Sequence, residues 1–279
     1  MERERMTAML LAGSDGTKYP MFLVVKSPAS KVVHIVNENM TKRHGFDRAV
    51  WAQIEPLQNS TGNSIYGNPP AWWNVKLSIE FLRFHFGSRA NMEENILLLW
   101  DDCSAHWTED VRQCASDINV ILLMVPVSYT WICQPADLSW NKPLKGTLRV
   151  TWVHFLRDQF SLHQDNVNFK MLVPKRNQVV DWVSKVWSSI SAQTIISGFV
   201  CAKLLVDDYE GDVEKEAPET LSEKAVDVVV RMKRLGLLDR MPSQIVDEND
   251  ICERGDNEDA SSSHDEEHET NGDDLEAYV

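Results

Sequence analysis

The sequence predicts an α/β protein with an acidic tail, and three observations support that fold class. Apolar runs at residues 96–100 and 120–125 enclose a predicted helix, a spacing typical of a strand–helix–strand unit with parallel strands. Amphipathic helical patterns precede and follow this unit. From Pro242 onward the chain consists mainly of Asp, Glu, Ser, Asn and His, so it has too few apolar residues to order itself.

The first predicted element is a β-hairpin. Short apolar runs at residues 7–11 and 19–25 are separated by a Gly-Ser-Asp-Gly turn signal at residues 13–16. A third strand is expected over residues 32–36, where Val and Ile are concentrated. Residues 59–70 are rich in Asn, Gly, Ser and Pro and are expected to form a loop.

The central elements follow from hydrophobic periodicity. Residues 72–86 predict an amphipathic helix whose aromatic side chains pack in the core. The next helix is expected to begin after Thr108, a good N-cap residue that precedes two acidic residues, and to end near Ser116. Pro126 stops the strand that begins at Val120.

Three further helices are predicted downstream. They cover residues 138–160, with Pro143 tolerated near the first turn, then residues 179–199, and finally residues 218–235.

Charge divides the chain into three predicted regions. Residues 1–206 form the predicted folded domain and carry a net charge of +3. Residues 207–240, an acidic linker with the last helix, carry −4, and residues 241–279, the tail expected to be disordered, carry −13. The weakly basic domain is compatible with a nucleic-acid partner.

Composition also excludes some classes of protein. The five cysteines form no C-x-x-C pair, which argues against a disulfide framework or zinc ribbon. We interpret them as small buried apolar residues, and their number and spacing indicate a reducing compartment. No apolar stretch is long enough for a membrane span, and the charged start predicts no signal peptide.

Two carboxylates stand out because each lies at an element boundary. Asp101 and Asp102 end the apolar run 96–100, and ligand sites in α/β sheets lie at the carboxyl ends of strands. Neighbouring residues of a strand point to opposite sides, so one of the two is a candidate metal ligand, whereas the alternative is that both only cap the next helix. Asp137 is either a second ligand or an N-cap of the following helix.

Other polar residues near these aspartates are open to two interpretations. His106 could orient a carboxylate or approach a phosphate, or it could be a structural histidine. Lys142, Lys145 and Arg149 could share one helix face that either meets phosphates or is simply solvated.

These segments resemble a known family. The run Leu-Leu-Leu-Trp-Asp-Asp-Cys-Ser-Ala-His at residues 97–106 resembles the "LLLLDNxxAH" strand of the DDE superfamily endonuclease domain of pogo, tigger and jerky-like transposases. Gln-Pro-Ala-Asp at residues 134–137 resembles the family's "QPLD" segment. The opening hairpin and residues 182–199 resemble the family's first and last conserved segments, so the similarity spans about residues 6–200.

The resemblance implies an RNase H-like fold, in which helices flank a mixed sheet. It implies Mg²⁺ or Mn²⁺ ions held by three carboxylates, DNA as partner and substrate, and a nuclear location. Asp101 corresponds to the second catalytic acid and Asp137 to the third, while Asp102 stands where the family usually has Asn.

The sequence also departs from the family pattern. The family's first acid lies in a strand ahead of the hairpin, and we expect this chain to lack it together with the helix-turn-helix region. Metal binding and cleavage are then expected to be weak or absent.

Two functions follow as hypotheses. One is a transposase-derived endonuclease-like domain, and the other is a non-catalytic nucleic-acid or protein interaction module. The acidic tail either solubilises the chain or contacts basic nuclear proteins. The sequence leaves open whether the protein forms oligomers.

Overall fold

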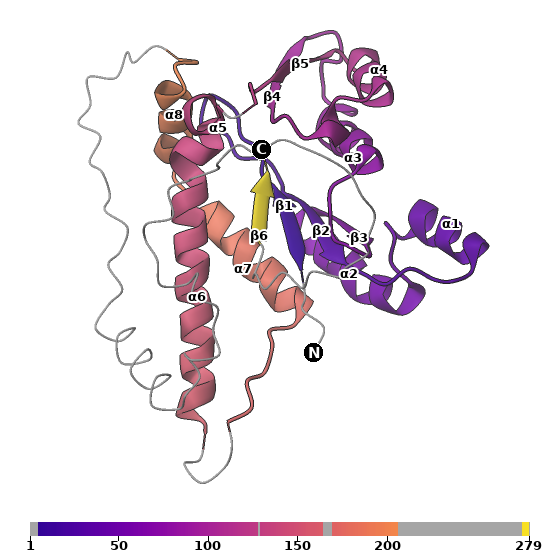
Figure 1. Cartoon of the computed structure of the whole chain (residues 1–279), viewed down its shortest axis with the longest axis vertical. Helices are drawn as coiled ribbons and strands as arrows, with labels where there is room; N and C mark the ends of the chain where they lie inside the picture. The colour runs from indigo at the N-terminus through magenta and orange to yellow at the C-terminus, as the bar shows by residue number, and fades with distance from the viewer. Residues whose placement is uncertain (1–4, 128, 164–168, 206–274, 279) are drawn as a thin grey trace, which may run out of the picture. The chain divides into compact units, whose positions relative to one another are not determined.

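The computed structural model describes residues 5–127, 129–163, 169–205 and 275–278 (Figure 1). These residues form a mixed α/β fold of the RNase H-like class with two small sheets. One sheet has four strands in the order β3 (Ser64–Asn68), β2 (Phe22–Lys26), β1 (Met6–Met9) and β6 (Leu275–Tyr278), and the other pairs β4 (Ile96–Trp100) with β5 (Val120–Met124). No helix in the described part of the chain is both long enough and apolar enough to span a membrane.

The predicted hairpin is confirmed. Strands β1 (Met6–Met9) and β2 (Phe22–Lys26) pair antiparallel, and Ala12 bridges to Lys18 beyond the strand ends. Gly16 occupies the left-handed region at φ 86° within the turn, a conformation that glycine adopts without a steric penalty.

Two strands flank the hairpin, and neither was predicted. Strand β3 (Ser64–Asn68) runs parallel to β2 and lies inside the segment predicted to be a loop, so that prediction is wrong. The polar composition was misleading because Asn63 is itself buried and its side chain accepts a hydrogen bond from Met21 N–H at 2.9 Å. Strand β6 (Leu275–Tyr278) runs parallel to β1 and belongs to the acidic tail; the other residues of the tail and the predicted helix 218–235 lie outside the described residues.

The strand predicted over residues 32–36 is also wrong, because helix α1 (Val33–Lys42) begins there. Val33 is 74% exposed, so its β-branched side chain has no sheet face to pack on. Helix α2 (Arg48–Thr61) follows, and the Asp47 carboxylate caps it by accepting the N–H groups of its first turn.

The predicted strand–helix–strand unit is confirmed. Strands β4 (Ile96–Trp100) and β5 (Val120–Met124) are parallel and enclose helix α4 (Glu109–Asp117). Helix α3 (Val75–Phe86) precedes the unit as predicted, and the short 3₁₀ turn η1 (Ser104–His106) follows β4.

The C-terminal helices differ in detail from the prediction. After the single turn α5 (Thr130–Cys133), a π-helical turn η2 (Ala136–Trp140) leads directly into α6 (Asn141–Ser161). The segment predicted as one helix over residues 179–199 is two helices, α7 (Arg176–Ser189) and α8 (Ala192–Cys201). The break occurs because Ile190 has an extended backbone and Ser191 caps α8.

The hairpin builds a core on each of its faces because successive strand residues point to opposite sides. Met6, Ala8 and Leu23 face a cluster that includes residues of α7 and Trp140. Met9, Phe22 and Val24 face a second cluster with α3, α4 and the end of β4. The second cluster fixes Trp100, and hence the position of Asp101, against the hairpin.

Candidate metal centre at the end of β4

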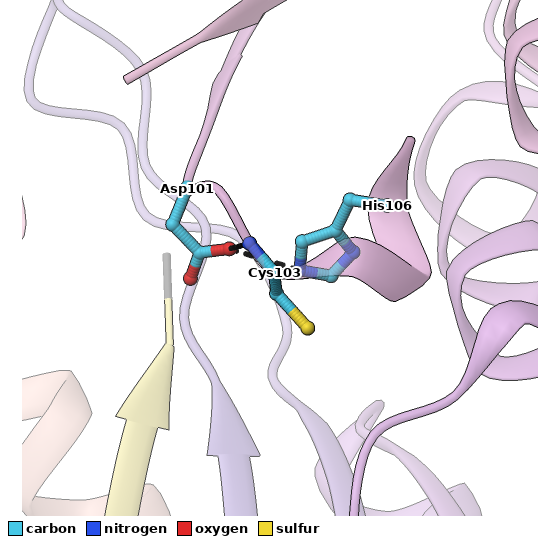
Figure 2. Close-up of side chains that lie close together, drawn as sticks. All are labelled: Asp101, Cys103 and His106. Carbon is cyan, nitrogen blue, oxygen red and sulfur yellow. Dashed lines mark hydrogen bonds and ion pairs between the residues drawn. The ribbon is translucent and has the colours of Figure 1, made fainter. Parts of the chain in front are cut away.

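Asp101 lies at the carboxyl end of β4 and is only 6% exposed. Its Oδ1 accepts the Cys103 backbone N–H at 3.0 Å, and its backbone carbonyl accepts the Trp107 indole N–H at 2.7 Å. The chain therefore turns back on itself directly after the strand, and the η1 turn brings the next polar side chains toward the carboxylate (Figure 2).

His106 is fully buried beside this carboxylate. Its Nε2 lies 3.2 Å from Asp101 Oδ1, but the two atoms are not aligned as a hydrogen bond. The ring stacks on Trp100 with centroids 3.9 Å apart, and Nδ1 lies 3.0 Å from Ser78 Oγ on α3. Burial prevents direct contact with a phosphate, so the geometry favours an orienting or structural role.

Cys103 completes a possible metal-binding triad with Asp101 and His106. One potential ligand atom from each residue lies within 4.8 Å of the other two (Figure 2). Burial of Cys103 raises the pKa of its thiol, and the charges of Asp101 and Asp102 raise it further. A divalent ion would oppose that shift, because a cysteine that binds a metal ion does so as the thiolate.

The donor set of this triad differs from that of a magnesium site. Mg²⁺ prefers oxygen ligands, whereas the triad offers one carboxylate, one sulfur and one imidazole nitrogen. The three residues by themselves therefore do not match the ion that the family resemblance implies. Asp102 is exposed on the chain next to Asp101, and no such group among the described residues includes it.

Asp137 is placed differently from Asp101. It is exposed in the first turn of η2, and its Oδ1 accepts a hydrogen bond from the Asn141 side chain at 2.7 Å. Within the described residues, no group of three potential ligands contains Asp137. Its role as a metal ligand stays a prediction.

The predicted basic strip lies on α6. Lys142, Lys145 and Arg149 are all exposed. Lys145 lies three residues after Lys142 and Arg149 lies four residues after Lys145, a spacing that places the three side chains on one side of the helix. Among the described residues, none of the three forms an ion pair with a carboxylate. These three side chains therefore present positive charge on the exposed side of α6.

Sequence reasoning missed Cys103 and Ser78. Cysteines were expected to be buried apolar residues, which describes Cys114, but Cys103 is half-buried and Cys201 is exposed. The D-x-C-x-x-H spacing after a strand is the signal that could have indicated the triad. Nothing local to Ser78 marks it, because it meets His106 only through the packing of α3 against η1.

The mixed α/β fold with a buried carboxylate at the end of a parallel strand is consistent with an RNase H-like endonuclease domain. The sequence profile of the DDE superfamily endonuclease family matches residues 3–199, and the chain belongs to that family.

Two relatives are each described as a pogo transposable element with KRAB domain. The mouse (Mus musculus) protein is 21% identical over 81% of this chain and 35% of its own length. The human (Homo sapiens) protein is 21% identical over 78% of this chain and 32% of its own length. The chain thus spans about a third of these relatives. No solved structure matches the chain.

Proposed function

We propose that this chain is a DNA-binding domain of transposase origin that cleaves DNA weakly or not at all. The observation that carries the proposal is the family match over residues 3–199 together with the buried carboxylate of Asp101 at the end of β4. The names of the two relatives, which describe transposable elements, support a DNA partner and a nuclear location.

The exposed face of α6 is the proposed DNA contact. Lys142, Lys145 and Arg149 present three cations on one side of the helix. Contacts between such side chains and phosphates release counterions, so binding should weaken steeply as salt is added. We expect no sequence preference from this face alone, because phosphate contacts carry no base information.

Weak cleavage is expected because, within the described residues, Asp101 and Asp137 are the two carboxylates that correspond to the family's catalytic acids. Asp101 and Asp137 are the residues proposed to hold Mg²⁺ or Mn²⁺, and Asp137 is exposed. Two monodentate carboxylates bind such ions loosely, since these ions dehydrate reluctantly and prefer more oxygen ligands. Loss of one group that stabilises the transition state commonly lowers kcat by about 10²–10³.

A cleavage assay with the full chain tests this proposal. Labelled duplex DNA is incubated with Mg²⁺ or Mn²⁺ and wild-type protein, Asp101→Ala, Asp137→Ala, or the exposed control Asp102→Ala. We expect trace cleavage at most from all four proteins. Strong cleavage by the wild type and by Asp102→Ala that both other substitutions abolish would show that the site is catalytically competent.

A second candidate function is a non-catalytic interaction module. Asp101 Oδ1 already accepts the Cys103 N–H and lies against His106, while Asp137 is hydrogen-bonded to Asn141. Both carboxylates therefore have structural partners that do not require catalysis. The two functions differ in their response to Mg²⁺, because an ion that binds the native state raises the unfolding temperature and an ion that does not bind leaves it unchanged.

A further inference from the structure

The two-stranded sheet of β4 and β5 has one apolar face that is exposed, and the proposed function does not use it. We propose that two copies of this chain associate through this face, with the sheet of one copy packed against the sheet of the other. The inference is independent of DNA binding by α6 and of cleavage at Asp101, because the face is apolar and uncharged.

The sequence of both strands is typical of a sheet that is buried on two faces. Residues 96–100 are Ile-Leu-Leu-Leu-Trp and residues 120–124 are Val-Ile-Leu-Leu-Met, so apolar residues do not alternate with polar ones. Parallel strands with such continuous apolar runs normally have both faces covered. The apolar character also continues beyond β5, since no charged residue occurs from Ile118 to Ala136.

The single chain covers one of these two faces. Leu98 on this face is buried in the cluster that includes side chains of α3 and α4. On the other face, Leu97 lies opposite Ile121. Leu99 and Leu123 form the next pair along that face. Leu97 is 63% exposed and Ile121 is 52% exposed, so this outer face of β4 and β5 meets solvent in the described part of the chain.

The exposed area is large enough for a dimer. Met124, Val127 and Tyr129 continue the exposed apolar sequence at the end of β5. Together with the outer face, side chains of this size and exposure present roughly 500 Å² per copy. Pairing two such surfaces buries about 1,000 Å², which is the lower limit for a specific protein–protein interface.

A second copy fits this face better than a charged partner does. A nucleic acid or a basic protein is recognised through charge, and the outer face has none to offer. A second copy brings the same apolar side chains, and two-fold symmetry places one such face on the other. Sheets that pack in this way lie about 10 Å apart with their side chains interdigitated.

Salt dependence distinguishes this association from one that uses the charged parts of the chain. Each copy carries a net charge of −14, whereas the outer face is uncharged. Added salt therefore screens the repulsion between copies and should tighten the dimer. An association of the acidic tail of one copy with the basic face of α6 of another would weaken as salt is added.

Sedimentation equilibrium of the full chain, at several micromolar concentrations and at low and high salt, tests the proposal. We expect a monomer–dimer equilibrium that shifts toward the dimer as salt increases. Leu97→Lys and Ile121→Lys should each raise the dissociation constant by about 100-fold, because a two-fold interface receives each new charge twice. Both positions are exposed in the monomer, so the circular dichroism spectrum of each variant should match that of the wild type.

Leu172 provides the matched control. It lies between α6 and α7, outside the outer face, and is 65% exposed, close to the value for Leu97. Leu172→Lys adds the same charge and should retain the wild-type dissociation constant. A monomer at every concentration, a dimer that salt weakens, or a dimer that Leu97→Lys and Ile121→Lys leave intact would overturn the proposal. Equal loss of the dimer in Leu172→Lys would do the same, because the effect would then not depend on this face.

Discussion

At the level of single residues, buried polar groups with incomplete hydrogen bonding mark the places where side-chain chemistry matters. His106 Nε2 is one, and His85 Nε2 on α3 is another. The environments of the two rings differ. His106 faces a carboxylate, whereas His85 lies among the aromatic rings of Tyr19, Phe81 and Phe84. His106 therefore lies beside a negative charge, whereas His85 lies in aromatic surroundings.

His85 should make stability depend on pH. Burial lowers the pKa of His85 from 6.5 to about 4, so between these values the unfolded chain binds a proton that the folded chain does not. The unfolding free energy should therefore fall as pH decreases from 6.5 to 4, by about 3 kcal/mol at most. His85→Phe, measured by urea unfolding across this pH range, should flatten that part of the profile.

The control for this measurement is His154, an exposed histidine on α6. His154→Gln should retain the wild-type slope. An unchanged slope in His85→Phe would assign the pH dependence to other groups.

At the level of elements, the predictable parts are those whose signal is local. The strand run 96–100, the Gly16 turn and the periodicity of α3 each follow from neighbouring residues. The missed parts depend on distant packing. Strand β3 forms because β2 offers it an edge, and α1 replaces the predicted strand because Val33 has no such edge.

The contact between α8 and η2 shows how elements position the Asp137 turn. A Cβ atom on Gly198 of α8 would lie 2.5 Å from the Pro135 carbonyl oxygen. Ala normally stabilises a helix interior by about 1 kcal/mol relative to Gly. Here overpacking should reverse the sign, so Gly198→Ala should destabilise the fold by roughly 1–3 kcal/mol in thermal or urea unfolding.

Gly146 in α6 is the matched control for Gly198. Its added Cβ would meet nothing within 4 Å, so Gly146→Ala should stabilise the protein by about 0.5–1 kcal/mol. Equal effects of the two substitutions would mean that the α8–η2 contact does not restrict position 198. The π-helical geometry of η2 itself had no local sequence signal, since the pattern there is that of an ordinary helix start.

At the level of the whole molecule, charge is divided between parts of the chain. Residues 1–206 carry +3 and include the basic face of α6, whereas residues 241–279 carry −13. The sequence alone predicted this division together with the α/β class and the position of Asp101. It could not predict that Asp101 would meet a sulfur and an imidazole, because that meeting depends on the η1 turn and on α3.

This division of charge gives a test of whether the tail competes with DNA. Deleting residues 242–273 removes most of the negative charge but retains β6, which pairs with β1. If the tail screens the basic face, the deletion should tighten DNA binding at low salt, and the gain should shrink above about 0.15 M salt, where the Debye length is about 8 Å. Fluorescence anisotropy of a labelled duplex measures both effects.

In a background with Lys142, Lys145 and Arg149 changed to Ala, the deletion should have little effect, because the face that the tail screens is no longer basic. Equal tightening in both backgrounds would place the competition elsewhere, and unchanged affinity in both would leave the tail without a role in DNA binding.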